Sequence, residues 1–131
     1  MIRTKSIFDK IEEEDGIRIS VMSRHTDNGG KKPDPRITPD KYDRWDKDLA
    51  PKDKLVYALF SGKLPQSAYN KHYKKKLRTE EIIPKVKALA KEGLEKTITL
   101  LCSEKDARYC HRKILAEECQ KYEPSLEVKH I

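Results

Sequence analysis

The feature that most constrains this chain is the stretch 97–112, which reads TITLLCSEKDARYCHR. Its β-branched and leucine residues predict a buried strand that ends at Cys102. After a short charged turn, a helix is expected to begin with Asp106 as its N-cap, which would place Cys110, His111 and Arg112 within about its first two turns. Open α/β sheets place their ligands where a strand ends beside the first turn of the next helix. The stretch therefore indicates a site, but it does not by itself name a reaction.

Hydrophobic patterning predicts a sheet of about four strands. The strand patterns lie at 2–8, 17–22, 97–102 and 126–131, and the helical patterns lie at 51–60, 65–77, 79–93 and about 106–122. Strands separated by helices imply a mainly parallel sheet with helices on both faces. At 131 residues the chain is expected to form a single α/β domain, interrupted by an irregular, proline-rich loop at about 26–44.

Charge and cysteine content limit the classes of partner and compartment. The net charge is +7, from 29 basic and 22 acidic residues, which favours a phosphorylated or otherwise anionic partner, although an inert cationic surface explains it equally well. No apolar run approaches the roughly 20 residues of a membrane span, and the N-terminus lacks the apolar core of a secretory signal. Three cysteines without a disulfide-scaffold pattern indicate the reducing cytoplasm.

A reactive thiol is the first hypothesis for the site. A cysteine at a strand tip, beside the positive end of a helix and basic side chains, lies in surroundings that lower a thiol pKa and bind anions. We expect Cys102 to be the nucleophile and His111 to be its acid–base partner. In this hypothesis the ligand is bound by Arg24, His25, Trp45, Arg108 and Arg112. An equally simple interpretation is that His111 and Arg112 only brace the helix.

Metal binding is the second hypothesis. Cys102, Cys110 and His111 are zinc-type ligands, and three of them with an open position would suit a catalytic site. Against this, Cys110 and His111 would point ~100° apart as neighbours on a helix. Cys110 and Cys119 also fall on an inward helical stripe typical of core thiols, and we assign Cys119 to the core. No other cofactor is predicted, and zinc remains the alternative.

Two weaker patterns point to other function classes. The spacing between Cys102 and Arg108 coincides with the phosphate loop of tyrosine phosphatases, but this segment has no glycine and carries the carboxylate of Glu104. The lysine-rich face within residues 71–78 suggests a nucleic-acid-binding module, although such a face is more often simply solvated.

Several segments resemble one known family. They are LLCSEKDARYCHR at the site, IRISVMSR from Ile17 to Arg24, WDKDLAP from Trp45 to Pro51, and YNKHYKKKL from Tyr69 to Leu77. In this order they are similar to domain-of-unknown-function family 488, which includes the YeaO-like proteins. The resemblance implies a small cytoplasmic prokaryotic α/β protein without an established activity. After Arg24 the chain departs from that group, because a loop rich in Asp, Gly and Pro replaces its usual Trp-Pro-Arg-Gly turn.

Overall fold

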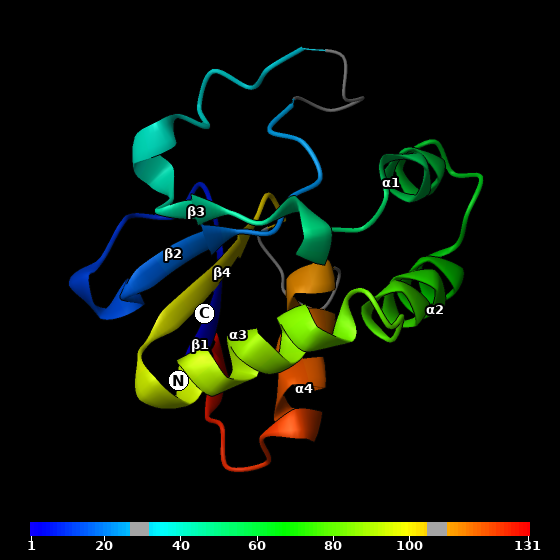
Figure 1. Ribbon diagram of the computed structural model, residues 1–131. Coiled ribbons are helices and arrows are strands. Elements are labelled where there is room, and N and C mark those ends of the chain that lie inside the picture. The colour runs from blue at the N-terminus through cyan, green and yellow to red at the C-terminus, as the bar shows by residue number, and fades with distance from the viewer. Residues whose placement is uncertain (27–31, 105–109) are drawn as a thin grey trace.

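A single parallel sheet of five strands forms the centre of the molecule (Figure 1). The computed structural model describes residues 1–26, 32–104 and 110–131. The strands are β1 Ile2–Ser6, β2 Ile17–Ser20, β3 Arg44–Trp45, β4 Ile98–Cys102 and β5 Val128–His130, in the order β3-β2-β4-β1-β5. The expected α/β class is confirmed. The strand that was not expected is β3, whose two residues are too few to show a periodic pattern.

The strand β4 is the centre of the sheet because it pairs on both sides. Its Ile98 is in register with Ile2 of β1 and Ile17 of β2. All five residues of β4 are buried, as the continuous apolar run predicts for a parallel strand covered on both faces. The carboxyl end of β4, and with it Cys102, therefore lies in the middle of the sheet edge.

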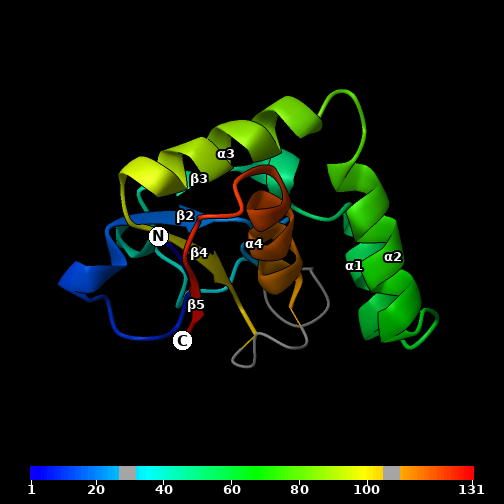
Figure 2. The same cartoon turned by 90° about the horizontal axis from the view of Figure 1, so that it is seen from below.

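The helices gather on one side of the sheet (Figures 1 and 2). They are α1 Asp53–Phe60, α2 Gln66–Leu77, α3 Ile83–Glu95 and α4 His111–Tyr122. The crossovers from β3 to β4 and from β4 to β5 run in the same direction across the sheet, so right-handed connections place α3 and α4 on the same face. The main core lies between these helices and the sheet, and it includes Cys119, whose predicted core position is confirmed.

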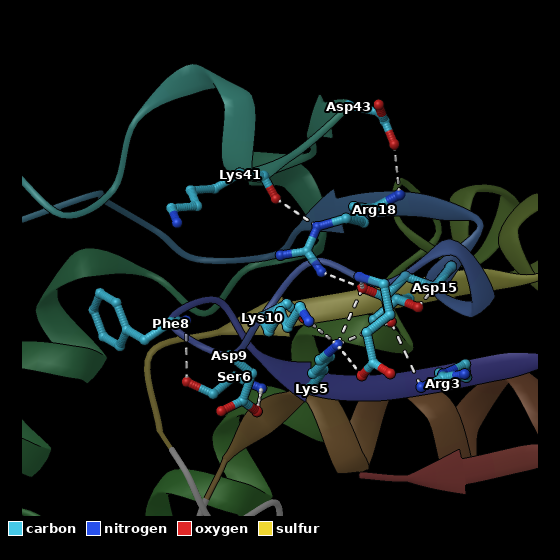
Figure 3. Close-up of polar contacts among 12 residues, drawn as sticks. Arg3, Lys5, Ser6, Phe8, Asp9, Lys10, Asp15, Arg18, Lys41 and Asp43 are labelled. Atoms are coloured by element: carbon cyan, nitrogen blue, oxygen red, sulfur yellow. Dashed lines mark hydrogen bonds and ion pairs between the residues drawn. The ribbon is translucent and has the colours of Figure 1, made fainter.

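The second face is covered by the short 3-10 helix η1 (Glu13–Asp15) and by irregular chain rather than by α-helices. Side chains alternate along β1, so Ile2 joins the apolar core while Arg3 and Lys5 point to this other face. There they surround the buried carboxylate of Asp15, together with Arg18 (Figure 3). Among the described residues, no helix has the length and apolar character needed to cross a membrane.

Candidate functional site

Cys102, Cys110 and His111 meet where β4 ends and α4 begins. Cys102 is the last residue of β4, and His111 is the first residue of α4. Cys110 is the N-cap of α4, with an extended backbone at φ −123° and ψ 143°. All three side chains are buried, and we refer to them as the Cys–His cluster.

The imidazole of His111 lies between the two sulfurs and the backbone of Val21, the residue that follows β2. Its Nε2 lies 2.5 Å from the carbonyl oxygen of Val21. Because a carbonyl can only accept, Nε2 carries a hydrogen and donates it, which leaves Nδ1 to face the thiols. Nδ1 lies 3.6 Å from Cys102 Sγ and 3.7 Å from Cys110 Sγ. The edge of His111 also packs on the Tyr73 ring, with centroids 5.3 Å apart, so the imidazole is held from two directions.

The pKa values of the two neighbouring thiols are shifted in opposite directions. The hydrogen bond from Cys110, together with the nearby His111, lowers the pKa of Cys102 well below its ordinary value despite burial. Burial and the neighbouring Cys102 raise the pKa of Cys110 well above its ordinary value. Of the two thiols, Cys102 therefore loses its proton more readily than Cys110.

The expectation that Cys110 and His111 diverge is wrong. It assumed that both residues lie on the helix, whereas Cys110 precedes the helix in an extended conformation. The two sulfurs and the His111 nitrogen lie within 4.8 Å of one another, an arrangement that could hold a metal ion. The Val21 carbonyl would then orient the ligating imidazole, as second-shell acceptors do in metal sites.

A cavity of about 520 Å³ opens onto the cluster from the carboxyl ends of the strands. Cys102, Cys110 and His111 line its inner end, with Glu104 beside them. Burial and the adjacent Cys102 raise the pKa of the Glu104 carboxyl. The walls are largely apolar and aromatic, and they include Phe8, Met22, Tyr57, Phe60 and Tyr69. This size and lining are typical of a small-molecule site.

Two arginines also line the cavity, each fixed by its own carboxylate. Arg24 Nε donates to Asp53 Oδ2 at 2.8 Å. Arg36 makes two bonds to Asp34, at 3.1 and 2.8 Å, and its guanidinium lies 4.2 Å from the centre of the Phe8 ring. Both side chains are more than half exposed, so they reach solvent while their positions are set.

The other predicted ligand-binding residues are placed elsewhere. His25 stacks on Trp45 at 3.7 Å between ring centroids, and its Nε2 bonds Ser20 Oγ at 2.7 Å. Neither ring is among the described residues that line the cavity. Arg112 is fully buried and donates to the backbone oxygen of Glu104 at 2.6 Å, so it fixes the chain beyond β4. Arg108, like the expected N-cap Asp106, lies outside the described residues.

Sequence reasoning missed the contribution of α1 and of the loop after β2. The helical pattern at 51–60 gave no indication of a site, yet Tyr57 and Phe60 are 60% and 61% exposed and line the cavity. Arg36 lies in the irregular loop, where no periodic pattern gives a direction to a side chain. Glu104 follows Cys102 by two residues and was considered only as an obstacle to phosphate. The one available signal for Glu104 was its place directly after the central strand.

Comparison with known proteins relates most of the chain to one family. The family model described as the active DUF488-N3 subclade matches residues 2–123, which is nearly the whole chain. No curated protein and no solved structure matches.

Proposed function

Since this chain belongs to the DUF488 family, with a match to its active N3 subclade, we propose that it binds a phosphate-bearing ligand and acts on it through Cys102. The description of the subclade as active supports a catalytic interpretation of the cluster. The observation that carries the proposal is that Cys102 Sγ lies 3.6 Å from His111 Nδ1 at the inner end of the cavity. The nucleophile, its base and the space for a ligand thus lie next to one another.

The cavity favours a ligand with an anionic group and an apolar or aromatic body. Arg24 and Arg36 offer charge-assisted hydrogen bonds beyond those they give to aspartates, and arginine suits phosphate oxygens. The aromatic side chains of Phe8, Tyr57 and Phe60 would contact the body of the ligand. The overall charge of +7 would assist the approach of an anion from solution.

The chemistry proposed is transfer of a group from the ligand to the Cys102 sulfur. The sulfur forms a bond to an electrophilic centre of the ligand, and the bond to the leaving group breaks. Glu104 is placed to donate a proton to that leaving group, because it lines the cavity beside Cys102, and burial and Cys102 raise the pKa of its carboxyl. His111 keeps the thiolate oriented, since the Val21 carbonyl fixes its ring. Reduced thiols of this kind fit the cytoplasm.

Alkylation of Cys102 at a series of pH values tests the proposal. With iodoacetamide and peptide mapping, we expect the reaction of Cys102 to have a midpoint well below the ~8.5 of a free cysteine. The variant His111→Gln should move this midpoint upward, whereas Cys119→Ser, which changes a core thiol away from the cavity, should not. A wild-type midpoint at the free-cysteine value would refute the thiolate mechanism.

A metal centre is the second candidate function, because the three ligand atoms converge within 4.8 Å. The donor set of two sulfurs and one nitrogen, with the second imidazole nitrogen bonded to a carbonyl, fits zinc. The ion would supply Lewis acidity at the inner end of the cavity. Elemental analysis of protein purified without a histidine tag tests this candidate. We expect one zinc per chain if it holds, with the metal lost in Cys110→Ser and kept in Cys119→Ser.

A further inference from the structure

The three cysteines of the chain divide into a pair and a single residue. All three are free thiols. Cys119 is buried in the main core, with its Sγ 3.9 Å from the Val86 carbonyl oxygen. Cys102 and Cys110 instead share the second, smaller apolar cluster and line the cavity. Only this pair combines mutual proximity with access from solvent among the described residues.

The two sulfurs of the pair lie near each other, as formation of a disulfide requires. Both sulfurs lie within 4.8 Å of each other and contact the same nitrogen, His111 Nδ1. A disulfide requires the sulfurs to approach to ~2.05 Å. The extended backbone of Cys110, outside the regular helix, allows a change of side-chain rotamer without disrupting the hydrogen bonds of α4.

We propose that Cys102 and Cys110 form a redox-active dithiol that reduces hydroperoxides and closes to a disulfide. This inference rests on the cluster geometry and is independent of the ligand proposed above. The cavity gives a peroxide access to Cys102, and Cys110 is placed as the resolving cysteine.

Two steps account for all atoms and electrons. The Cys102 thiolate attacks the outer oxygen of the hydroperoxide, the O–O bond breaks, and the alkoxide or hydroxide leaves and takes a proton from solvent. Cys102 is thereby oxidised to the sulfenic acid by two electrons. The Cys110 sulfur then attacks Cys102 Sγ, the S–O bond breaks, and the thiol proton of Cys110 leaves with the hydroxyl as water. An external dithiol returns the disulfide to two thiols.

Closing the disulfide would also remove the nucleophile and two of the three metal-ligand candidates in one step. Oxidation would therefore stop the proposed group transfer and release a bound metal. It would equally protect Cys102 from irreversible oxidation to the sulfinic acid.

Peptide mapping after oxidation tests this proposal directly. Reduced protein, treated with a chelator, is exposed to hydrogen peroxide and digested with trypsin without reductant. Trypsin cuts after Lys105 and Arg108, so a disulfide would hold peptides 97–105 and 109–112 together. We expect this linked pair as the main product, and we expect dithiothreitol to separate it.

Two variants keep the result interpretable. In Cys110→Ser, Cys102 should stop at the sulfenic acid and be captured by dimedone. In Cys119→Ser the linked peptides should form as in the wild type. Failure of the linkage in folded wild-type protein, or equal oxidation of Cys119, would overturn the proposal. The alkylation midpoint of Cys102, measured on reduced protein, would still decide the proposed function separately.

Discussion

His25 lies after β2 and His111 lies after β4, at the same edge of the sheet. Their hydrogen-bond partners give the two histidines different roles. His111 has a carbonyl on one nitrogen and two thiols on the other, so it links the backbone of Val21 to both cysteines. His25 has a serine hydroxyl on Nε2 and an indole on its face. Burial, and to a lesser degree Lys47, lowers the pKa of His25 to about 4. His25 is therefore neutral at physiological pH and serves to position Trp45.

The fluorescence of Trp45 should report the titration of His25, because Trp45 is the single tryptophan of the chain. We expect emission to change with a midpoint near pH 4, and we expect this transition to be absent in His25→Gln. The folded-state pKa lies below the ~6.5 of the unfolded chain, so the neutral ring contributes stability above ~6.5 that is lost as the pH falls towards 4. A midpoint near 6.5 would mean that the ring is solvated rather than stacked.

Cys110 shows where residue-scale prediction from sequence reached its limit. The structure brings Cys102 and His111 close together, as the strand pattern and the following helix indicated. The start of the helix was not predicted correctly, since Asp106 is a better N-cap by residue preference than Cys110. That shift, from a helical to an extended Cys110, decides whether the second sulfur and the imidazole converge. Backbone conformation at a single residue is not encoded in a hydrophobic pattern.

At the scale of elements, the buried Asp15 joins η1 to the second face of the sheet (Figure 3). Its carboxylate pairs with Lys5 at 3.1 Å and with Arg18 at 2.5 Å, while Arg3 lies 3.5 Å away. Burial alone would raise the pKa of Asp15, but the Glu12 backbone hydrogen bond, Lys5 and Arg18 together hold it below its ordinary value. One carboxylate thus neutralises part of a buried cluster of three cations.

The variant Asp15→Asn should therefore be strongly destabilised. Removing the charge leaves Arg3 and Arg18 without a carboxylate partner among the described residues and leaves Lys5 with that of Glu12 alone, which we expect to lower the free energy of unfolding by ~3 kcal/mol. Urea unfolding at pH 7 measures this, with Glu12→Gln as the matched control. The Glu12 side chain pairs with the same Lys5 but is 45% exposed, so its loss should be much milder. The difference between wild type and Asp15→Asn should begin to shrink below pH ~4, where the carboxyl of the unfolded chain takes up a proton, and it should disappear only below the lowered pKa of Asp15 in the folded protein.

The elements themselves were largely predictable, and the exceptions have physical causes. Periodicity located four strands and four helices because each of these segments carries a regular apolar pattern. The strand β3 was missed because two exposed residues carry no periodic signal, and it is held by backbone contacts such as Asp43 N–H to the Arg18 carbonyl. The α-helices cover only one face of the sheet because of the order in which the strands lie in it. The sequence of elements along the chain does not give this order.

At the scale of the whole molecule, the hairpin of α1 and α2 extends away from the main body (Figures 1 and 2). The residues that line the cavity come from the segments that follow the strands and from this hairpin. Basic side chains lie both at the cavity and away from it. Arg24 and Arg36 line the cavity and are fixed by aspartates. Lys71 and Lys75 lie on the exposed face of α2. A local anion site and a general basic field therefore depend on different residues.

Matched double variants separate these two sources of anion affinity. The pairs Arg24→Gln/Arg36→Gln and Lys71→Gln/Lys75→Gln each lower the net charge of +7 by two. The probe is phenyl phosphate, and the measurement is the concentration that halves the alkylation rate of Cys102 at 150 mM salt. We expect this concentration to rise at least about tenfold in the arginine pair, because each lost charge-assisted bond is worth ~1.5–3 kcal/mol.

The lysine pair should change the same concentration less than about twofold, since exposed charges beyond a Debye length of ~8 Å are screened at this salt. Equal effects of the two pairs would mean that phosphate responds to the field of the whole protein and not to the cavity. Binding of mixed single-stranded RNA at low salt, lost in the lysine pair alone, would then favour the nucleic-acid interpretation of α2. The position of the charge, at constant net charge, is thus what distinguishes a ligand site from a basic surface.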